Sequence, residues 1–124
     1  YNANPMSMRA AIDLLSYADT RRVAILGDMF ELGENSDRLH YETGVYAAQS
    51  DIEVLILIGE NAKYMNQAVD DYCRSHSDQS CEKHYFPYRD AALKELPAIL
   101  KDQDTILIKA SHGMGFDQIV KAIK

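Results

Sequence analysis

The sequence predicts an α/β domain, a Rossmann-like three-layer fold with a mostly parallel sheet and helices on both faces. Short apolar runs alternate with segments of helical periodicity, and each gap between two runs is long enough for a crossover helix. Most of these runs lack polar alternation, which is typical of strands that are covered on both faces. With 124 residues, 47% of them hydrophobic, the chain is expected to form one domain.

The expected strands are the four apolar runs at residues 23–26, 54–58, 84–86 and 105–108. Three of the four do not alternate between apolar and polar residues, so we expect both faces of these strands to be covered. Because the chain opens on a helix, we expect the strand before that helix to lie upstream of Tyr1, in a longer protein.

Five helices are expected around these strands. The first begins at Pro5, because asparagine at position 4 suits a helix cap and proline suits the first turn. The second follows Asn35 or Ser36, and Gly44 within it would let a neighbouring helix approach closely. The fourth contains Pro97, which we expect to break or kink it. The side chains expected to face the core are Met8, Ala11, Ile12, Leu15; Leu39, Thr43, Tyr46, Ala47; Ala62, Met65, Val69, Tyr72; Ala92, Leu93, Leu96, Ile99, Leu100; Phe116, Ile119, Val120 and Ile123.

Charge and cysteine content narrow the function classes. Thirteen Lys and Arg against 19 Asp and Glu give a formal charge of -6, so we expect no nucleic-acid or membrane partner. No apolar run approaches the roughly 20 residues that a membrane-spanning helix needs. Cys73 and Cys81 are too few for a disulfide-built secreted scaffold, so a cytoplasmic location is expected.

Ligands of open parallel sheets bind beyond the carboxyl ends of the strands. Four segments are predicted to lie there: residues 27–33, 59–61, 87–88 and 109–115. The last segment brings Lys109, Ser111, His112 and Gly113 to a strand-to-helix turn, where backbone N–H groups and the helix dipole favour a phosphate or carboxylate. The alternative is that its glycines only turn the chain and Ser111 caps the final helix.

The segment 27–33 contains Asp28 and Glu31, which could ligate a metal or orient a cation. The favoured interpretation is that both are solvated turn formers. His40, His76 and His84 have no ligand spacing with one another or with the cysteines, so neither a zinc site nor a cysteine nucleophile is expected. Neither a Walker loop nor a dinucleotide-binding glycine motif occurs, so no triphosphate cradle is expected on this chain.

Polar side chains also precede the first helix. Tyr1, Asn2 and Asn4 are placed at the same binding edge, and asparagine amides suit adenine edges or ribose hydroxyls. Asn4 is also a plain helix cap.

Four stretches, residues 1–8, 26–33, 39–40 and 108–115, resemble the carboxyl-terminal domain of the Mur ligase family in their order and spacing. They read Tyr-Asn-Ala-Asn-Pro-Met-Ser-Met, Leu-Gly-Asp-Met-Phe-Glu-Leu-Gly, Leu-His and Ile-Lys-Ala-Ser-His-Gly-Met-Gly. The resemblance covers essentially the whole chain. The first two stretches distinguish the ligases that add D-alanyl-D-alanine from their sister ligases.

The resemblance implies a three-domain, Mg²⁺-dependent enzyme of peptidoglycan synthesis. Such a ligase uses ATP to activate the carboxylate of UDP-N-acetylmuramoyl-tripeptide as an acyl phosphate, which the amine of D-alanyl-D-alanine attacks. A central domain would carry the P-loop and an N-terminal domain would hold the UDP-sugar. ATP and Mg²⁺ would therefore not be held by this chain alone, and the isolated chain is expected to be inactive. His112 departs from the pattern, because arginine is frequent there.

The resulting prediction is a lid domain with no catalytic residue of its own. Tyr1, Asn2, Asn4 and Lys109 are expected to bind the nucleotide. The expected dipeptide-binding residues are Asn61, Ser111, His112 and Gly113. A stand-alone flavodoxin-like binding or signalling module is the alternative, but it should show an acidic cluster with a lysine opposite. An oxidoreductase should show the missing glycine motif.

Overall fold

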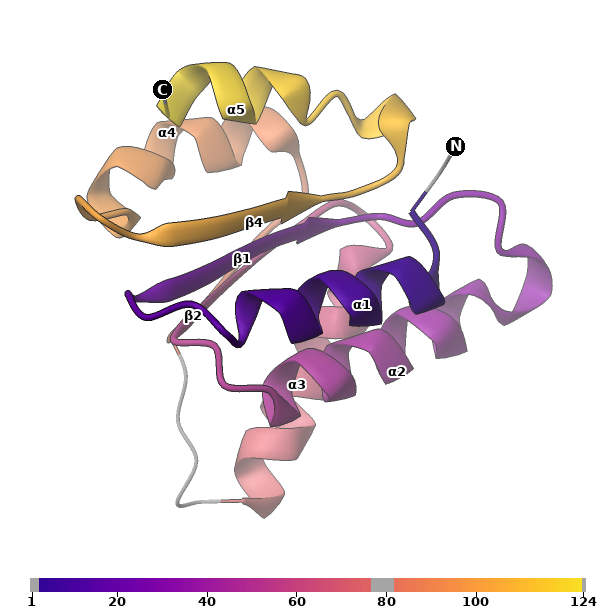
Figure 1. The fold of residues 1–124 in the computed structure, drawn as a ribbon. Coiled ribbons are helices and arrows are strands. Elements are labelled where there is room, and N and C mark those ends of the chain that lie inside the picture. Colours follow the sequence, from indigo (N-terminus) through magenta and orange to yellow (C-terminus); the bar gives the residue numbers. More distant parts are fainter. Residues whose placement is uncertain (1–2, 77–81, 124) are drawn as a thin grey trace.

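The computed structural model describes residues 3–76 and 82–123. Its sheet has the strands β1 (Arg22–Gly27), β2 (Val54–Ile58), β3 (Glu82–Phe86) and β4 (Thr105–Lys109). All neighbours pair in parallel, in the order β3-β2-β1-β4 (Figure 1). The predicted strands and their parallel arrangement are confirmed.

Helices cover both faces of this sheet, which confirms the predicted three-layer fold. The helices are α1 (Pro5–Leu15), α2 (Ser36–Gln49), α3 (Ala62–Ser75), α4 (Arg89–Ile99) and α5 (Asp117–Ile123). Helices α1, α2 and α3 pack on one face, whereas α4 and α5 pack on the other (Figure 1). Short 3-10 turns at Gly33–Asn35 and His112–Met114 precede α2 and α5. None of the described helices is long and apolar enough to cross a membrane.

The strand order reverses beside β1. The chain steps outward from β1 to β2 and β3, and α4 then crosses the opposite face to place β4 on the other side of β1. Open parallel sheets bind ligands at such a reversal point, at the carboxyl ends of the strands. The segments after β1 and β4 are therefore neighbours.

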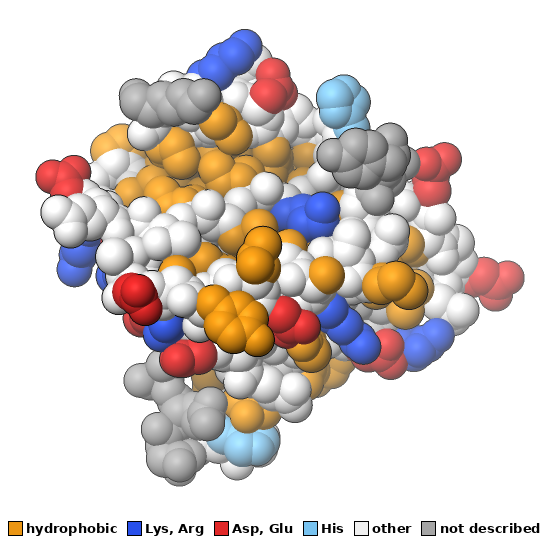
Figure 2. All heavy atoms as spheres, in the orientation of Figure 1, with side chains coloured by type: hydrophobic (Ala, Val, Ile, Leu, Met, Phe, Trp, Pro, Cys, Tyr) orange, Lys and Arg blue, Asp and Glu red, His pale blue; other side chains and the backbone are white. Residues whose placement is uncertain are grey.

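Strand β4 forms one edge of the described sheet. Among the described residues it pairs with β1 alone, so its outer side presents unpaired backbone groups. Hydrophobic side chains gather over the start of β4 and the adjoining helices α4 and α5 (Figure 2). They surround a shallow hollow of about 290 Å³, lined by Leu93, Leu96, Pro97, Leu100, Ile106 and Ile123, among others.

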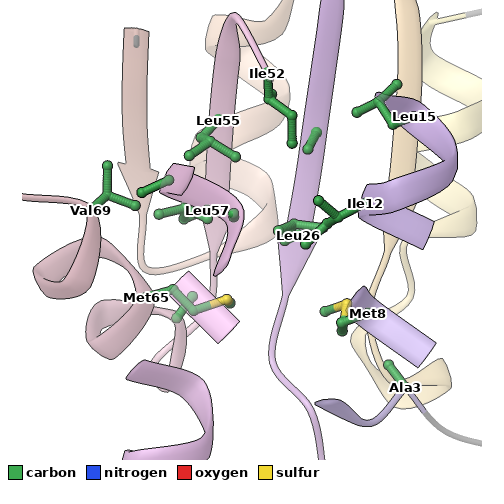
Figure 3. Close-up of a cluster of buried hydrophobic side chains, with 14 of the residues drawn as sticks. Ala3, Met8, Ile12, Leu15, Leu26, Ile52, Leu55, Leu57, Met65 and Val69 are labelled. Carbon is green, nitrogen blue, oxygen red and sulfur yellow. The ribbon is translucent and has the colours of Figure 1, made fainter. Parts of the chain in front are cut away.

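The sheet separates two apolar cores. Side chains of β1 alternate between them, with Leu26 on the α1 side and Ile25 on the α4 side. Figure 3 shows Met8 and Ile12 of α1 close to Leu26, and Met65 of α3 close to Leu57. Burial on both faces explains why the strand runs need no polar alternation.

Helix α2 presents a slightly different face from the predicted one. Its buried side includes His40 and Gly44, while Leu39 and Tyr46 are only half-buried. The predicted close approach at Gly44 is confirmed, because a Cβ there would lie 2.7 Å from the Met65 Cα of α3.

Helix α4 does not end at Pro97, so the expected break is wrong. The proline lies inside the helix, which continues to Ile99. Proline removes a single N–H donor, and the bond at the end of the helix, from the Leu100 N–H to the Leu96 carbonyl, is still made at 2.9 Å. The helix therefore continues past the proline.

Candidate functional site

Ser111 ties the segments after β1 and β4 together. Its hydroxyl oxygen accepts the Phe30 N–H at 2.7 Å, and its own N–H donates to the Asp28 carbonyl at 3.0 Å. The residue is 1% exposed, so these bonds form out of contact with water. Two segments predicted separately to lie at the carboxyl ends of the strands therefore form one unit.

The alternative role predicted for Ser111, as the cap of the final helix, is wrong. Ser111 precedes the 3-10 turn at His112–Met114, and its side chain makes no capping hydrogen bond there. Gly115 does turn the chain, with a φ of 67° that glycine adopts readily.

His40 fixes the middle of the segment after β1 although it lies on α2. Its Nε2 accepts the Met29 N–H at 2.9 Å, and its Nδ1 lies 2.8 Å from the Ser36 carbonyl oxygen. An N–H only donates and a carbonyl only accepts, so these contacts require a neutral ring that is protonated on Nδ1. The imidazole is fully buried.

Asp28 links the same segment to the start of α3. It is 5% exposed, and its Oδ1 accepts the Ala62 N–H at 2.8 Å. Gly59 makes room for this carboxylate, since a Cβ there would lie 2.2 Å from Oδ1. Burial raises the pKa of Asp28, against the lowering effect of the backbone N–H groups of Asn61 and Ala62.

The interpretation of Asp28 as a solvated turn former is therefore wrong, because it is a buried carboxylate that caps α3. Glu31 is exposed and adopts a positive φ of 62°, as expected of a turn residue. Among the described residues, no three His, Cys, Asp or Glu side chains are placed to hold a metal ion. The thiol of Cys73 is free, and Cys81 lies outside the described residues.

Above this buried network lies a hollow of about 540 Å³ at the end of β4. The residues that line it include Lys109, Ser111 and His112 from the end of β4, and also Ala3, Phe116 and Asp117. Neither the Lys109 amine nor the His112 ring has a hydrogen-bond or ion-pair partner within residues 3–76 and 82–123. These two side chains are therefore available to an anion.

Phe30 and Arg89 shape the rim of the site. The Phe30 ring, 36% exposed, lies against Gly113, where a Cβ would come within 2.8 Å of it. Arg89, the first residue of α4, donates from Nη1 to the carbonyls of Met114 (3.4 Å) and Gly115 (3.2 Å). Residues 87–88 were predicted to lie at the binding edge, but Arg89 was not. The signal that could have identified it is a cationic side chain three residues after the end of β3.

The predicted site residues are brought together in part. Lys109, Ser111, His112 and Gly113 lie at the end of β4, and Asn61 lies across the edge beside Asp28, at the start of α3. No side-chain partner within the described residues engages Asn61. Tyr1 and Asn2 lie outside the described residues.

Asn4 is confirmed as the cap of α1. Its Oδ1 accepts the Ser7 N–H at 2.9 Å, and its own N–H donates to the Ser7 hydroxyl at 3.1 Å. Its neighbour Ala3 lines the hollow beside Lys109, so this end of α1 lies at the binding edge.

Comparison with known proteins identifies relatives of the whole chain. The family model described as Mur ligase, glutamate ligase domain, matches residues 1–112. A UDP-N-acetylmuramoyl-tripeptide–D-alanyl-D-alanine ligase of Rickettsia prowazekii is 31% identical over 121 residues, 97% of this chain and 25% of that protein. The chain thus spans about a quarter of the length of the curated relatives it matches.

Solved structures share the fold over nearly all of the chain. MurF from Acinetobacter baumannii superimposes with a TM-score of 0.83 at 25% identity, over 100% of this chain and 27% of that one. MurF from Thermotoga maritima, solved in complex with ADP, gives 0.75 at 22% identity, over 98% and 26%.

Proposed function

The chain belongs to the Mur ligase family, and from that premise we propose that it is the carboxyl-terminal lid domain of an ATP-dependent ligase of peptidoglycan synthesis. The reaction would join D-alanyl-D-alanine to UDP-N-acetylmuramoyl-tripeptide, as the name of its relatives states. Family membership argues against the stand-alone flavodoxin-like module. The observation that carries the proposal is the Lys109 amine and the His112 imidazole, which have no partner among the described residues and lie beside the interlocked loops after β1 and β4.

We assign the nucleotide to the side of the hollow nearest α1. The Lys109 amine, half-buried and without a partner among the described residues, would meet phosphate oxygens. Tyr1, Asn2 and Asn4 would contact the ribose or base. Support comes from Ala3, which lines the same hollow as Lys109. The ADP complex of the Thermotoga maritima enzyme shows that an enzyme of this fold holds such a nucleotide.

We assign the dipeptide to the opposite side, toward the start of α3. The carboxylate of D-alanyl-D-alanine must be held while its amine stays free to attack. His112 is exposed and would donate to that carboxylate, with Gly113 beside it and Asn61 as a second contact. Ser111 would act from below, by holding the loop that presents His112.

The remaining parts of the reaction would lie on other domains of the same enzyme. The described residues offer no metal-holding cluster, so we assign Mg²⁺ and the phosphate cradle to the central domain. The UDP-sugar would bind the N-terminal domain. The isolated chain would then release no ADP or phosphate when given both peptide substrates, and the enzyme would work in the cytoplasm.

A strand from the preceding domain boundary would complete the sheet. The outer side of β4 is unpaired within the described residues, and Ala3 lines the same hollow as Ile108 and Lys109 at its end. A strand running into Tyr1 would reach this edge directly. It would also cover the apolar surface that flanks β4.

Substitution of His112 in the full-length ligase tests the proposal. His112→Ala should lower kcat/KM for D-alanyl-D-alanine at least about tenfold, while the KM for ATP stays within about twofold, because a charge-assisted hydrogen bond contributes about 1.5–3 kcal/mol. The matched control is Arg38→Ala, an exposed cation on α2 away from the site. A change in the dipeptide constant under about twofold, or roughly 0.4 kcal/mol, would reject the assignment.

A further inference from the structure

Three of the four polar residues that are buried as whole residues converge on one short stretch of chain. Within the described residues, these four are Asp28, His40, Thr43 and Ser111. The Thr43 hydroxyl bonds within its own helix, to the Leu39 carbonyl at 2.8 Å. The other three all hold residues 28–30, although they come from three different elements. Burying polar groups is costly unless each is paired, so this concentration needs a reason.

Residues 28–30 are held in three directions. The Asp28 side chain reaches α3, and its carbonyl accepts from Ser111. The Phe30 N–H donates to the Ser111 hydroxyl on the β4 side. Between them, the Met29 N–H donates to His40 on α2. The His40 ring is thus the central support, and it holds the peptide from which the other two contacts diverge.

His40 has the right chemistry for this support in one protonation state only. Its Nε2 must accept and its Nδ1 must donate. The other neutral tautomer and the charged ring both carry a proton on Nε2, which would face the proton of the Met29 N–H. The contact then becomes repulsive, and the stretch loses its fixed position.

We propose that His40, as the neutral imidazole protonated on Nδ1, is the positioning residue of the ligand edge. It fixes the Met29 peptide, which directs Asp28 toward α3 and Phe30 toward Ser111, and so sets the loop that carries Lys109, His112 and Gly113. His40 touches no ligand in this arrangement. The effect on the loop stands alone, whereas the effect on dipeptide use rests on the proposed function.

Two substitutions separate the two ring contacts. Glutamine at position 40 can place a carbonyl acceptor near the position of Nε2. Asparagine can place a donor near the position of Nδ1 but does not reach Met29. His40→Gln should therefore restore what His40→Asn loses. Thr43→Val is the matched control, because it removes a buried hydroxyl from the same helix without touching residues 28–30.

Amide hydrogen exchange of the 124-residue chain, followed by NMR, reads the loop directly. In His40→Asn, exchange at Met29, Phe30 and Ser111 should rise at least about tenfold more than at β2 amides, a local loss of about 1.4 kcal/mol. His40→Gln should recover most of that protection, and Thr43→Val should leave it unchanged. In the unsubstituted chain, the His40 ¹⁵N spectrum should show a protonated Nδ1 and a bare Nε2.

A protonated Nε2 would overturn the proposal, as would equal exchange at these three amides in His40→Asn and Thr43→Val. If His40→Asn proves too unstable to study, the tautomer and His40→Gln still decide, because loss of protection in His40→Gln contradicts the acceptor role. In the full-length ligase, His40→Asn should lower kcat/KM for D-alanyl-D-alanine more than Thr43→Val does. Altered loop exchange with unaltered dipeptide kinetics would reject the proposed function and leave the positioning role standing.

Discussion

The two ends of the sheet differ in how their charged and polar side chains are paired. At the amino end, Arg21 pairs with Asp104 through two bonds of 3.0 Å and also donates to the Ile99 carbonyl at 2.7 Å. Arg22 beside it pairs with Asp51 and Glu53. Every charged group of this cluster thus has an opposite charge as its neighbour.

At the carboxyl end, the buried side chains of Asp28, His40 and Ser111 bond to backbone groups and not to opposite charges. The Asp28 carboxylate accepts the Ala62 N–H. The His40 ring contacts the Met29 N–H and the Ser36 carbonyl. Ser111 bonds to the Phe30 N–H and to the Asp28 carbonyl. The cationic Lys109 and the imidazole of His112 have no partner within the described residues. An anion can bind a cation only where no carboxylate already occupies it. The amino end therefore has its charges paired, whereas the carboxyl end leaves the Lys109 amine available to an anion.

Removing a cation should therefore cost stability at one end and little at the other. Arg21→Ala should lower the free energy of unfolding by about 3 kcal/mol, because it leaves the nearly buried Asp104 carboxylate without an opposite charge. Lys109→Ala should change it by less than about 0.5 kcal/mol. Urea denaturation of both variants measures the difference. Equal losses would remove the distinction between the two ends.

Two glycine substitutions test how closely the chain packs around Asp28 at the carboxyl end of the sheet. Gly59→Ala should cost at least about 2 kcal/mol, because φ is +130° and the new Cβ would collide with the Asp28 carboxylate. Gly33→Ala, with a φ of +73° and open space around it, should cost only about 1 kcal/mol. Thermal unfolding gives both values. A loss at Gly33 as large as that at Gly59 would show that Asp28 has room to move.

Lowering the pH should change the contributions of Asp104 and Asp28 to stability in opposite directions. This is the smallest of the expected effects. The hydrogen bond from Arg21 lowers the pKa of Asp104, so its stabilisation is present above the unfolded value of 3.8 and is lost as the pH falls through the folded pKa. Burial raises the pKa of Asp28, so the folded state takes up this proton first, and its contribution to stability grows as the pH falls from the folded pKa toward 3.8.

Denaturation between pH 7 and pH 3 tests these signs. Asp104→Asn should flatten the loss of stability in acid, whereas Asp28→Asn should steepen it relative to the unsubstituted chain. Asparagine keeps an acceptor for the Ala62 N–H in the second variant, so the fold is preserved. Curves that shift in the same direction would contradict the opposite environments of the two groups.

Much of the fold was predictable because it depends on local sequence. The apolar runs that became β1 and β2 are buried on both faces, and their spacing left room for crossover helices. The rule that parallel strands end at one edge also placed residues 27–33 and residues 109–115 at the same edge of the sheet, although not as neighbours. The cap at Asn4 followed from the proline after it.

The buried chemistry of the site was not predictable in the same way. Asp28 is buried because Gly59, on another strand, lacks a side chain. His40 faces the core because a distant peptide and its own helix satisfy both ring nitrogens. Arg89 reaches Gly115 because its long side chain crosses from α4. Each depends on contacts between segments far apart in the sequence, which periodicity and spacing do not contain.

We propose that ligands bind at the carboxyl end of the sheet and not at the amino end. Hydrogen exchange of the full-length ligase, measured with and without a non-hydrolysable ATP analogue and D-alanyl-D-alanine, tests it directly. We expect the ligands to slow amide exchange in residues 27–33 and 109–115 and to leave exchange in residues 19–22 and 101–104 unchanged. Protection of the amino-end segments, with none at residues 27–33 and 109–115, would contradict it.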